Sequence, residues 1–432
     1  MISTLSRAGR YAERASVRGA TIDDADSSLP EALALQPNHP SSLAFPLLAA
    51  ILFLFFVSAS VPSPLFIVFQ GRWGFSPGML TVAFSIYSLV LLVTLLVAGS
   101  LSDHLGRKPV IVAALVIQIV SIALFLTADG IGGLLAARIA QGISMGVVNG
   151  ALSAAVIEAA PPARKAVGSL FTSISPLAGL ATGAFVTGAL LGVTDKAEIW
   201  AFGLLGGLFC LGAASVLLIP ETASPVPGLL RSMVPSVHVA RSTRDGFARG
   251  LPLLLSIWAL GGFVSALGPS LLRTVFDVSS GLLNGATVAV LCGAGAVSPL
   301  MMRGLPPGRM AVVGMAVVTA GVGLLLVSIS TGALALFFVG SAVAGAGLGA
   351  SFSGLIQSLV PLTPVHERAE LFAAIFLVTY LSLSVPPIAA GFAVPLTGFL
   401  GTTQAYLGAV LIVSAIATVL QWLPSRSRGA PA

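Results

Sequence analysis

The chain has 432 residues, of which 56% are hydrophobic and only 8% are charged, and its formal net charge is +6. Soluble globular domains carry about a quarter charged residues, so this composition excludes a soluble fold and indicates a polytopic membrane protein. The basic excess does not indicate a nucleic-acid partner, because the basic residues stand in short segments between apolar runs, where they set orientation in the membrane.

Twelve apolar stretches, each near the ~20 residues that span a bilayer as a helix, follow a polar segment over residues 1–42. The polar segment lacks the apolar core of a signal peptide and is expected to be a disordered cytoplasmic tail. The apolar runs do not alternate as barrel strands do, so helices are the expected spanning elements. The predicted spans are 43–69, 77–101, 109–128, 131–155, 166–193, 198–220, 251–272, 281–302, 309–330, 333–360, 370–397 and 401–423.

A single long internal segment, 221–250, divides the spans into six and six. The expected organisation is an N-terminal half over 43–220, a central cytoplasmic loop over 221–250, a C-terminal half over 251–423 and a cytoplasmic tail over 424–432. With the N-terminus inside, the only basic residues placed outside are Arg72, Lys196 and Arg273. The positive-inside rule therefore predicts that both termini are cytoplasmic.

The two halves carry related sequences. The pattern S-A-x-x-P-S-x-L occurs at 58–65 and again at 265–272, which is 207 positions later. A proline followed by small residues recurs at Pro176 and Pro387, 211 positions apart. Two matches at similar offsets favour a duplication that produces two pseudo-symmetric halves.

Between the second and third spans lies the sequence G-x-L-x-D-x-x-G-R-K, formed by Gly99, Asp103, Gly106, Arg107 and Lys108. It resembles the cytoplasmic loop between helices two and three of major facilitator superfamily transporters. The resemblance implies an all-α fold of twelve transmembrane helices, and a gate in which Asp103 and Arg107 lock the cytoplasmic side in the outward-facing state. The alternative is a solvated loop that only fixes orientation, which would explain the basic pair but not the acid and the glycines.

The fourth span contains Arg138, Gln141 and Gly142, which resemble the superfamily signature R-x-x-Q-G. Arg138 lies about 10 Å into the span at 1.5 Å per residue, and a charge inside the membrane is a functional candidate by default. The alternative is an arginine that extends its side chain to the outer interface. Glycines at 142, 146 and 150 form one smooth face for close helix packing.

Glu158 stands twenty residues after Arg138, about 30 Å along the same helix, and therefore reaches the cytoplasmic face. Superfamily members often place an acid there, so an Asp103–Arg107–Glu158 cluster is predicted. The alternative is an ordinary interfacial glutamate beside Arg164 and Lys165.

In the fifth span, Pro176 and Gly179 fit part of the superfamily's antiporter signature G-x-x-x-G-P-x-x-G-G. Ser175 and Leu180 replace two of its glycines, which weakens the indication of export. A purely structural bend at the proline is an equal alternative.

Polar and aromatic residues within the spans are candidates for a substrate cavity, although each could instead bond to a neighbouring helix. These candidates are Ser58, Tyr87, Gln118, Asn149, Trp258, Asn284, Gln357 and Tyr380. Two cysteines inside apolar spans give no metal site, and the chain carries no nucleotide-binding or catalytic motif. No cofactor and no enzymatic activity are expected.

No acidic residue falls in the middle of a predicted span. Proton coupling would therefore use Asp103, Glu158, Asp277 or a titratable substrate, and uniport is the remaining option. Together with the resemblance, the sequence predicts a monomeric inner-membrane secondary transporter of the major facilitator type. Protons are expected to drive its export of a small organic molecule. Uptake or uniport of an organic anion, or a transport-inactive receptor or scaffold, are the alternatives.

Overall fold

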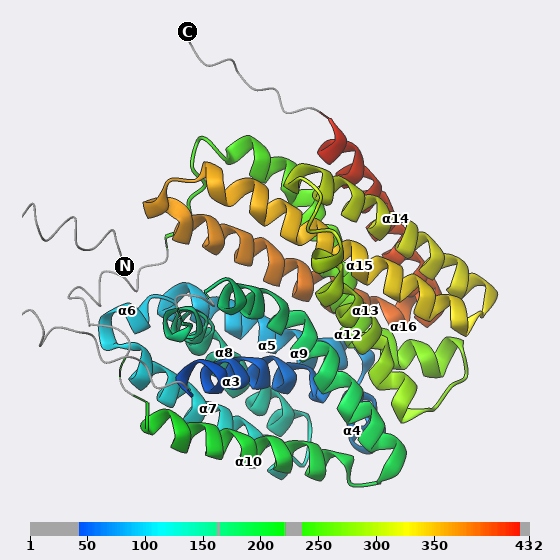
Figure 1. The fold of residues 1–432 in the computed structure, drawn as a ribbon. Coiled ribbons are helices and arrows are strands. Elements are labelled where there is room, and N and C mark those ends of the chain that lie inside the picture. The colour runs from blue at the N-terminus through cyan, green and yellow to red at the C-terminus, as the bar shows by residue number, and fades with distance from the viewer. Residues whose placement is uncertain (1–42, 162–164, 220, 222–235, 424–432) are drawn as a thin grey trace, which may run out of the picture. The chain divides into compact units, whose positions relative to one another are not determined.

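The computed structural model describes residues 43–161, 165–219, 221 and 236–423, and the secondary structure of these residues is helical. The expected tails over 1–42 and 424–432, and residues 222–235 of the expected central loop, lie outside the described residues. Figure 1 shows a first set of helices in blue to green and a second set in yellow-green to red. The first set comprises α3 (Ala44–Ser60), α4 (Pro62–Trp73), α5 (Pro77–Ala98), α6 (Leu101–Leu105), α7 (Arg107–Thr127), α8 (Ile131–Ala159), α9 (Lys165–Val193) and α10 (Ala197–Leu217).

The second set comprises α12 (Arg244–Val275), α13 (Gly281–Met301), α14 (Pro307–Thr331), α15 (Leu334–Leu359) and α16 (Arg368–Trp422). Two short 3₁₀ turns, Val360–Leu362 and Val365–Glu367, join α15 to α16. Within the described residues, eleven helices are long and apolar enough to cross a membrane. The last of them contains two predicted spans, because Gly398 breaks its helical backbone (φ 74°, ψ 162°) between them.

The observed helices differ from the predicted spans at two places. The first span is interrupted at Val61, between α3 and α4, where Pro62 and Pro64 follow. Helix α12 begins at Arg244, inside the segment expected to be loop. A helix satisfies its own backbone hydrogen bonds, so α12 can extend beyond the apolar run. A span predicted from hydropathy instead stops at the first charged residues.

Glycines allow the helices of the first set to pack closely. A Cβ on Gly142 would lie 2.6 Å from the carbonyl oxygen of Tyr87, and one on Gly146 would lie 2.8 Å from that of Leu91. Helix α8 therefore lies directly against the α5 backbone, as the small-residue face predicted.

The two sets meet mainly along two antiparallel helix pairs, α9 with α13 and α5 with α16, with smaller contacts of α12 with α4 and α5. Along α9 and α13 the close approaches run from Leu191 against Gly281 to Leu177 against Gly295. We call the end of the molecule where Leu191 meets Gly281 the far end. The opposite side, where α6 lies, is called the motif end.

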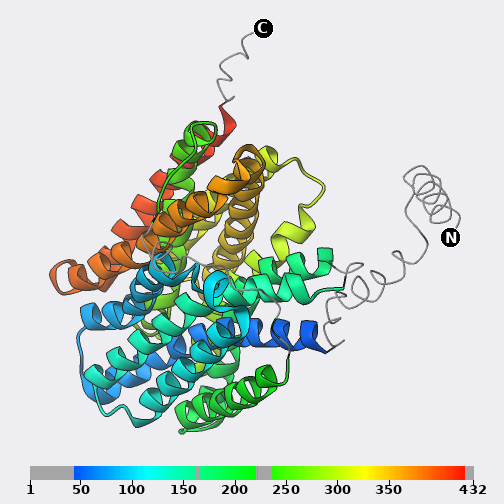
Figure 2. The same cartoon turned by 90° about the vertical axis from the view of Figure 1, so that its left-hand side faces the viewer.

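At the motif end, α9 exposes a side chain that would continue this interface. Leu170, seven residues before Leu177 on the same helix face, is 46% exposed. The two sets are thus joined mainly at the far end, and Figure 2, turned by 90°, shows them again as separate groups. The described fold is an all-helical bundle of two six-span sets.

Candidate functional site

The loop between α5 and α7 is a short helix followed by a sharp turn. Gly106 has a backbone φ of 96°, a conformation that residues other than glycine rarely adopt. A Cβ at this position would also lie 2.7 Å from Oε2 of Glu221. Glycine is therefore required both by the backbone and by the space beside it.

Glu221 caps the amino terminus of α7 from the segment that follows α10. Its two carboxylate oxygens accept hydrogen bonds from the backbone N–H groups of Arg107 (2.9 Å) and Lys108 (3.0 Å). These groups have no partner within their own helix, and the positive end of the helix dipole favours the carboxylate. In return, Nζ of Lys108 donates to the carbonyl of Leu217 at the end of α10 (2.7 Å).

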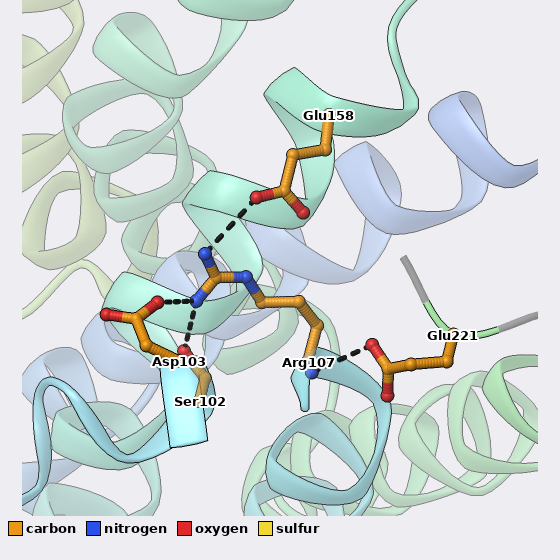
Figure 3. Close-up of polar contacts among 5 residues, drawn as sticks. All are labelled: Ser102, Asp103, Arg107, Glu158 and Glu221. Atoms are coloured by element: carbon orange, nitrogen blue, oxygen red, sulfur yellow. Dashed lines mark hydrogen bonds and ion pairs between the residues drawn. The ribbon is translucent and has the colours of Figure 1, made fainter. Parts of the chain in front are cut away.

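The guanidinium of Arg107 lies between two carboxylates. Nη1 donates to Asp103 (2.5 Å) and to the Ser102 hydroxyl (2.6 Å), while Nη2 donates to Glu158 at the end of α8 (3.2 Å). Figure 3 shows this arrangement, with Glu221 on the backbone side of Arg107. The structure thus brings together the three residues for which a cluster was predicted.

The cluster fastens α6 to the ends of α7 and α8. The carboxylates of Asp103 and Glu158 are 54% and 37% exposed, so each ion pair contributes only about 0.2–1 kcal/mol. These energies are too small to hold the bundle together, yet large enough to shift a balance between two conformations. The three charged residues of the cluster all lie in the first set of helices.

Arg138 is buried rather than extended to the surface, with 1% of its area exposed. Its guanidinium donates to the backbone carbonyls of Ala83 (3.1 Å), Phe84 (2.9 Å) and Ala59 (3.4 Å), and to Oε1 of Gln141 (2.6 Å). The alternative of an arginine that reaches the interface is therefore wrong. The charge is held in place by backbone dipoles of α3 and α5.

The ring of Tyr87 lies 4.4 Å from the Arg138 guanidinium carbon, and that of Phe66 lies 5.6 Å from it. Aromatic faces stabilise a cation at these distances. No ion pair to Arg138 is present among the described residues. The charge is consequently solvated by carbonyl groups and aromatic rings.

Gln141 extends this network to α3 and α7. Its Nε2 donates to the Ser58 carbonyl (2.9 Å) and hydroxyl (3.1 Å), and Nε2 of Gln118 donates to the same hydroxyl (2.7 Å). The Ser58 carbonyl is available because Pro62, four residues later, has no N–H to offer it. Ser58 and Gln118, proposed for a substrate cavity, are thus engaged in binding helices to one another.

The other cavity candidates are placed in different surroundings. Tyr87, Asn149 and Tyr380 are half-buried, and Gln357 is exposed. Trp258 Nε1 and Asn284 Oδ1 are buried atoms without a hydrogen-bond partner among the described residues. The Trp258 ring meets Phe352 edge to face at 5.5 Å.

Pro176 and Gly179 lie inside α9, which packs on α3. A Cβ on Gly179 would lie 2.5 Å from Cβ of Phe56, so this glycine is required for the packing of α9 on α3. That contact is within the first set of helices.

Sequence reasoning missed several residues that the structure brings to important positions. Glu221 is the first residue of the expected central loop, and no local pattern links it to a turn 114 residues earlier. Ser85 and Ser88 of α5 both contact Ser384 of α16. Serine within an apolar span was the available signal, but it does not identify the partner helix.

A metal site is not indicated by the part of the chain that the structure describes, where no three potential ligands gather. Cys292 is buried and Cys210 is exposed, and both are free thiols. A bundle of apolar helices in two sets, with a charge cluster at the turn after the second span, defines a polytopic protein of the transporter class.

The family model of the Major Facilitator Superfamily matches residues 48–305. This range is more than half of the chain, and the chain therefore belongs to that superfamily. Membership places it among transporters rather than enzymes.

The chain is 28% identical over 239 residues to the inner membrane transport protein YnfM of Escherichia coli K12. The match covers 53% of this chain and 55% of YnfM, so the chain spans about half the length of this relative. The match supports an inner-membrane, multi-pass location.

Solved structures with a similar fold include the human organic anion transporter MFSD10, with a TM-score of 0.60 and 16% identity over 88% of this chain and all of that one. A bacterial homologue of the human lysosomal transporter Spinster is also similar. In its inward-facing occupied form the TM-score is 0.68, with 14% identity over 92% of this chain and all of that one. In its inward-facing unoccupied form the TM-score is 0.67, with 14% identity over 89% and 99% of the two chains. At these identities the likeness concerns the fold alone.

Proposed function

We propose that this protein is a monomeric secondary transporter that exports a small organic molecule across the inner membrane by alternating access, in exchange for protons. Its two halves are 43–220 and 251–423, joined by the central loop, with both termini in the cytoplasm. The observation that carries the proposal is the Asp103–Arg107–Glu158 cluster at the motif end, where Leu170 on the α9 side of the seam between the two sets of helices is exposed.

The conformation supports an alternating mechanism. Contacts between the halves concentrate at the far end, and basic residues favour a cytoplasmic location for the motif end. On this orientation the structure is inward-facing, as are the two Spinster-homologue structures that it resembles in fold. Rocking of one half against the other would then close the motif end.

In this proposal the cluster is a gate. It holds α6 in a fixed position on α7 and α8, so that α6 presents a defined surface to the second half when the motif end closes. In the present conformation the members of the ion pairs are all in the first half. The contacts that lock the outward-facing state would therefore form only after one half has rotated against the other and closed the motif end.

Asp103→Asn removes one charge from this cluster while keeping its shape. We expect a several-fold slower transport cycle with unchanged expression, because the pairs contribute about 0.2–1 kcal/mol each. Glu198→Gln is the matched control, since it neutralises an acid paired with Arg72 at 2.8 Å at the far end. Full transport by Asp103→Asn would refute the gate.

Substrate flux in inside-out vesicles tests the transport proposal itself. A panel of lipophilic cations and organic anions is supplied with and without an imposed pH gradient. Accumulation that requires the gradient and collapses with a protonophore is the expected result. Movement that ignores the gradient would refute proton exchange and indicate uniport.

The coupling groups proposed are the acids at the ends of the helices, because the described spans hold no acid near their centres. Glu158 and Asp103 lie in the cluster, and Asp277 follows α12 with a positive φ of 53°. Such a backbone conformation is unusual for a non-glycine residue. Neutralising each acid in turn, while measuring flux against pH, identifies the coupling group.

Uptake or uniport of an organic anion remains the second candidate, favoured by the uncompensated charge of Arg138. Four of its five N–H donors are already engaged by carbonyl oxygens, so it would act through its electric field rather than by direct contact. Transport of anions but not cations by the vesicle panel would favour this candidate.

A further inference from the structure

A proline inside a membrane helix leaves one carbonyl oxygen without its helical donor. Pro62 does this to the carbonyl of Ser58, and Pro269 does it to that of Ser265, since each lies four residues earlier. These two prolines occupy the same position in the repeated pattern S-A-x-x-P-S-x-L. In hydrocarbon, a carbonyl without a partner is costly, so each of them must find another donor.

The two halves supply that donor in different ways. In the first half, the Ser58 carbonyl accepts from Nε2 of Gln141 on α8 (2.9 Å), so the bond stays within one set of helices. In the second half, the corresponding helix α15 has Gln357 as its only amide, and this side chain is exposed. The Ser265 carbonyl instead accepts from the hydroxyl of Ser63 (2.5 Å), which lies on α4 of the first half.

The Ser63–Ser265 hydrogen bond therefore crosses between the halves at a buried position, with Ser63 3% exposed. Between α5 and α16, the Ser88 hydroxyl bonds to that of Ser384 (2.7 Å), and the Ser85 hydroxyl donates to the Ser384 carbonyl (3.2 Å). The α9–α13 seam is tightly packed as well, because a Cβ on Gly188 would lie 2.6 Å from Cα of Gly285. Opening of the far end would separate Ser63 from Ser265 and Gly188 from Gly285.

We propose that the Ser63–Ser265 hydrogen bond is a latch that stabilises the state closed at the far end, and that its strength comes from the carbonyl that Pro269 leaves unsatisfied. This inference rests on the alternating-access function proposed above. It implies an asymmetry between the repeats, since the equivalent carbonyl of Ser58 stays satisfied by Gln141 in both states.

Distances between spin labels at the far end measure the two states directly. Val193 of α9 and Leu396 of α16 are both exposed there, one in each half. Cysteines at these two positions, in a background with Cys210→Ser and Cys292→Ala, carry the labels in the full chain in lipid nanodiscs. The ratio of long to short distance populations reports the opening of the far end.

Ser63→Ala is expected to raise that ratio about fivefold or more, because it removes a hydrogen bond and leaves a buried carbonyl unsatisfied. Ser270→Ala, at the equivalent position of the repeat, is the matched control and is expected to leave the ratio unchanged. Pro269→Ala restores the helical N–H and should shift the ratio in the same direction as Ser63→Ala, while adding Ser63→Ala to it should have little further effect.

Equal ratios for Ser63→Ala and Ser270→Ala would overturn the latch, as would an effect of Ser63→Ala that is undiminished in the Pro269→Ala background. If Ser63→Ala does not fold, the Pro269→Ala ratio decides alone, and an unchanged ratio rejects the latch. A single distance population in all variants, at every bulk pH tested, would instead contradict alternating access. Failure of the latch and failure of the proposed function are thus separate results.

Discussion

Removing the neutral side chain of Gln141 should destabilise the protein more than removing the buried charge of Arg138. Gln141→Leu leaves the Ser58 carbonyl, which Pro62 has already deprived of its helical donor, without a partner. It also takes one acceptor, at 2.6 Å, from the Arg138 guanidinium. At about 1–3 kcal/mol for each of these two groups left unsatisfied, the expected loss is about 2–6 kcal/mol.

Arg138→Met has a smaller expected cost. It leaves Oε1 of Gln141 unpaired, but the carbonyls of Ala83 and Phe84 keep their own helical donors within α5. The burial of a lone charge, which costs several kcal/mol per ion, disappears at the same time. The lost hydrogen bonds and ring contacts of the guanidinium offset this relief. The net expectation is therefore a loss of about 1–3 kcal/mol from the orphaned amide oxygen.

Unfolding can be followed through the buried thiol of Cys292 after the exposed Cys210 is replaced by serine. The rate of labelling by a thiol reagent in detergent, against temperature, gives the order of stability for the two variants and the parent. Greater destabilisation by Arg138→Met than by Gln141→Leu would refute this reasoning. It would mean that backbone dipoles and aromatic rings stabilise the buried charge more than its desolvation costs.

Three further outcomes are expected at the motif end; their stability changes are measured by the same thiol assay, and transport by the vesicle flux assay. Gly106→Ala should lose about 1–3 kcal/mol because of its positive φ, whereas Gly132→Ala, with open space around it, should lose nothing. Glu221→Gln should lose about 0.5–2 kcal/mol by weakening the cap of α7; an unchanged stability would show that water replaces it. Arg107→Lys should cost less than 1 kcal/mol in stability. It should nevertheless slow transport, because one ammonium group cannot reach Ser102, Asp103 and Glu158 together as the planar guanidinium does. Flux equal to that of the parent would show that the guanidinium geometry is not needed.

The sequence by itself determined the class of protein and the course of the chain. Spans of about 20 apolar residues must be helices in a membrane, because the backbone has to satisfy its hydrogen bonds internally. The loop pattern around Asp103 and Arg107 located the charge cluster, and the helical rise of 1.5 Å per residue placed Glu158 at the same end. These features depend on local spacing, which a sequence records directly.

The tertiary structure alone decided how the polar groups inside the membrane are satisfied. The sequence left a surface position for Arg138 open as an alternative, and only the carbonyls of two neighbouring helices show that it stays inside. The pairing of Ser63 with Ser265 joins residues 202 positions apart. A proline predicts that a carbonyl will be freed, but the donor that reaches it depends on which helices pack together and at what height, and no local pattern carries that information.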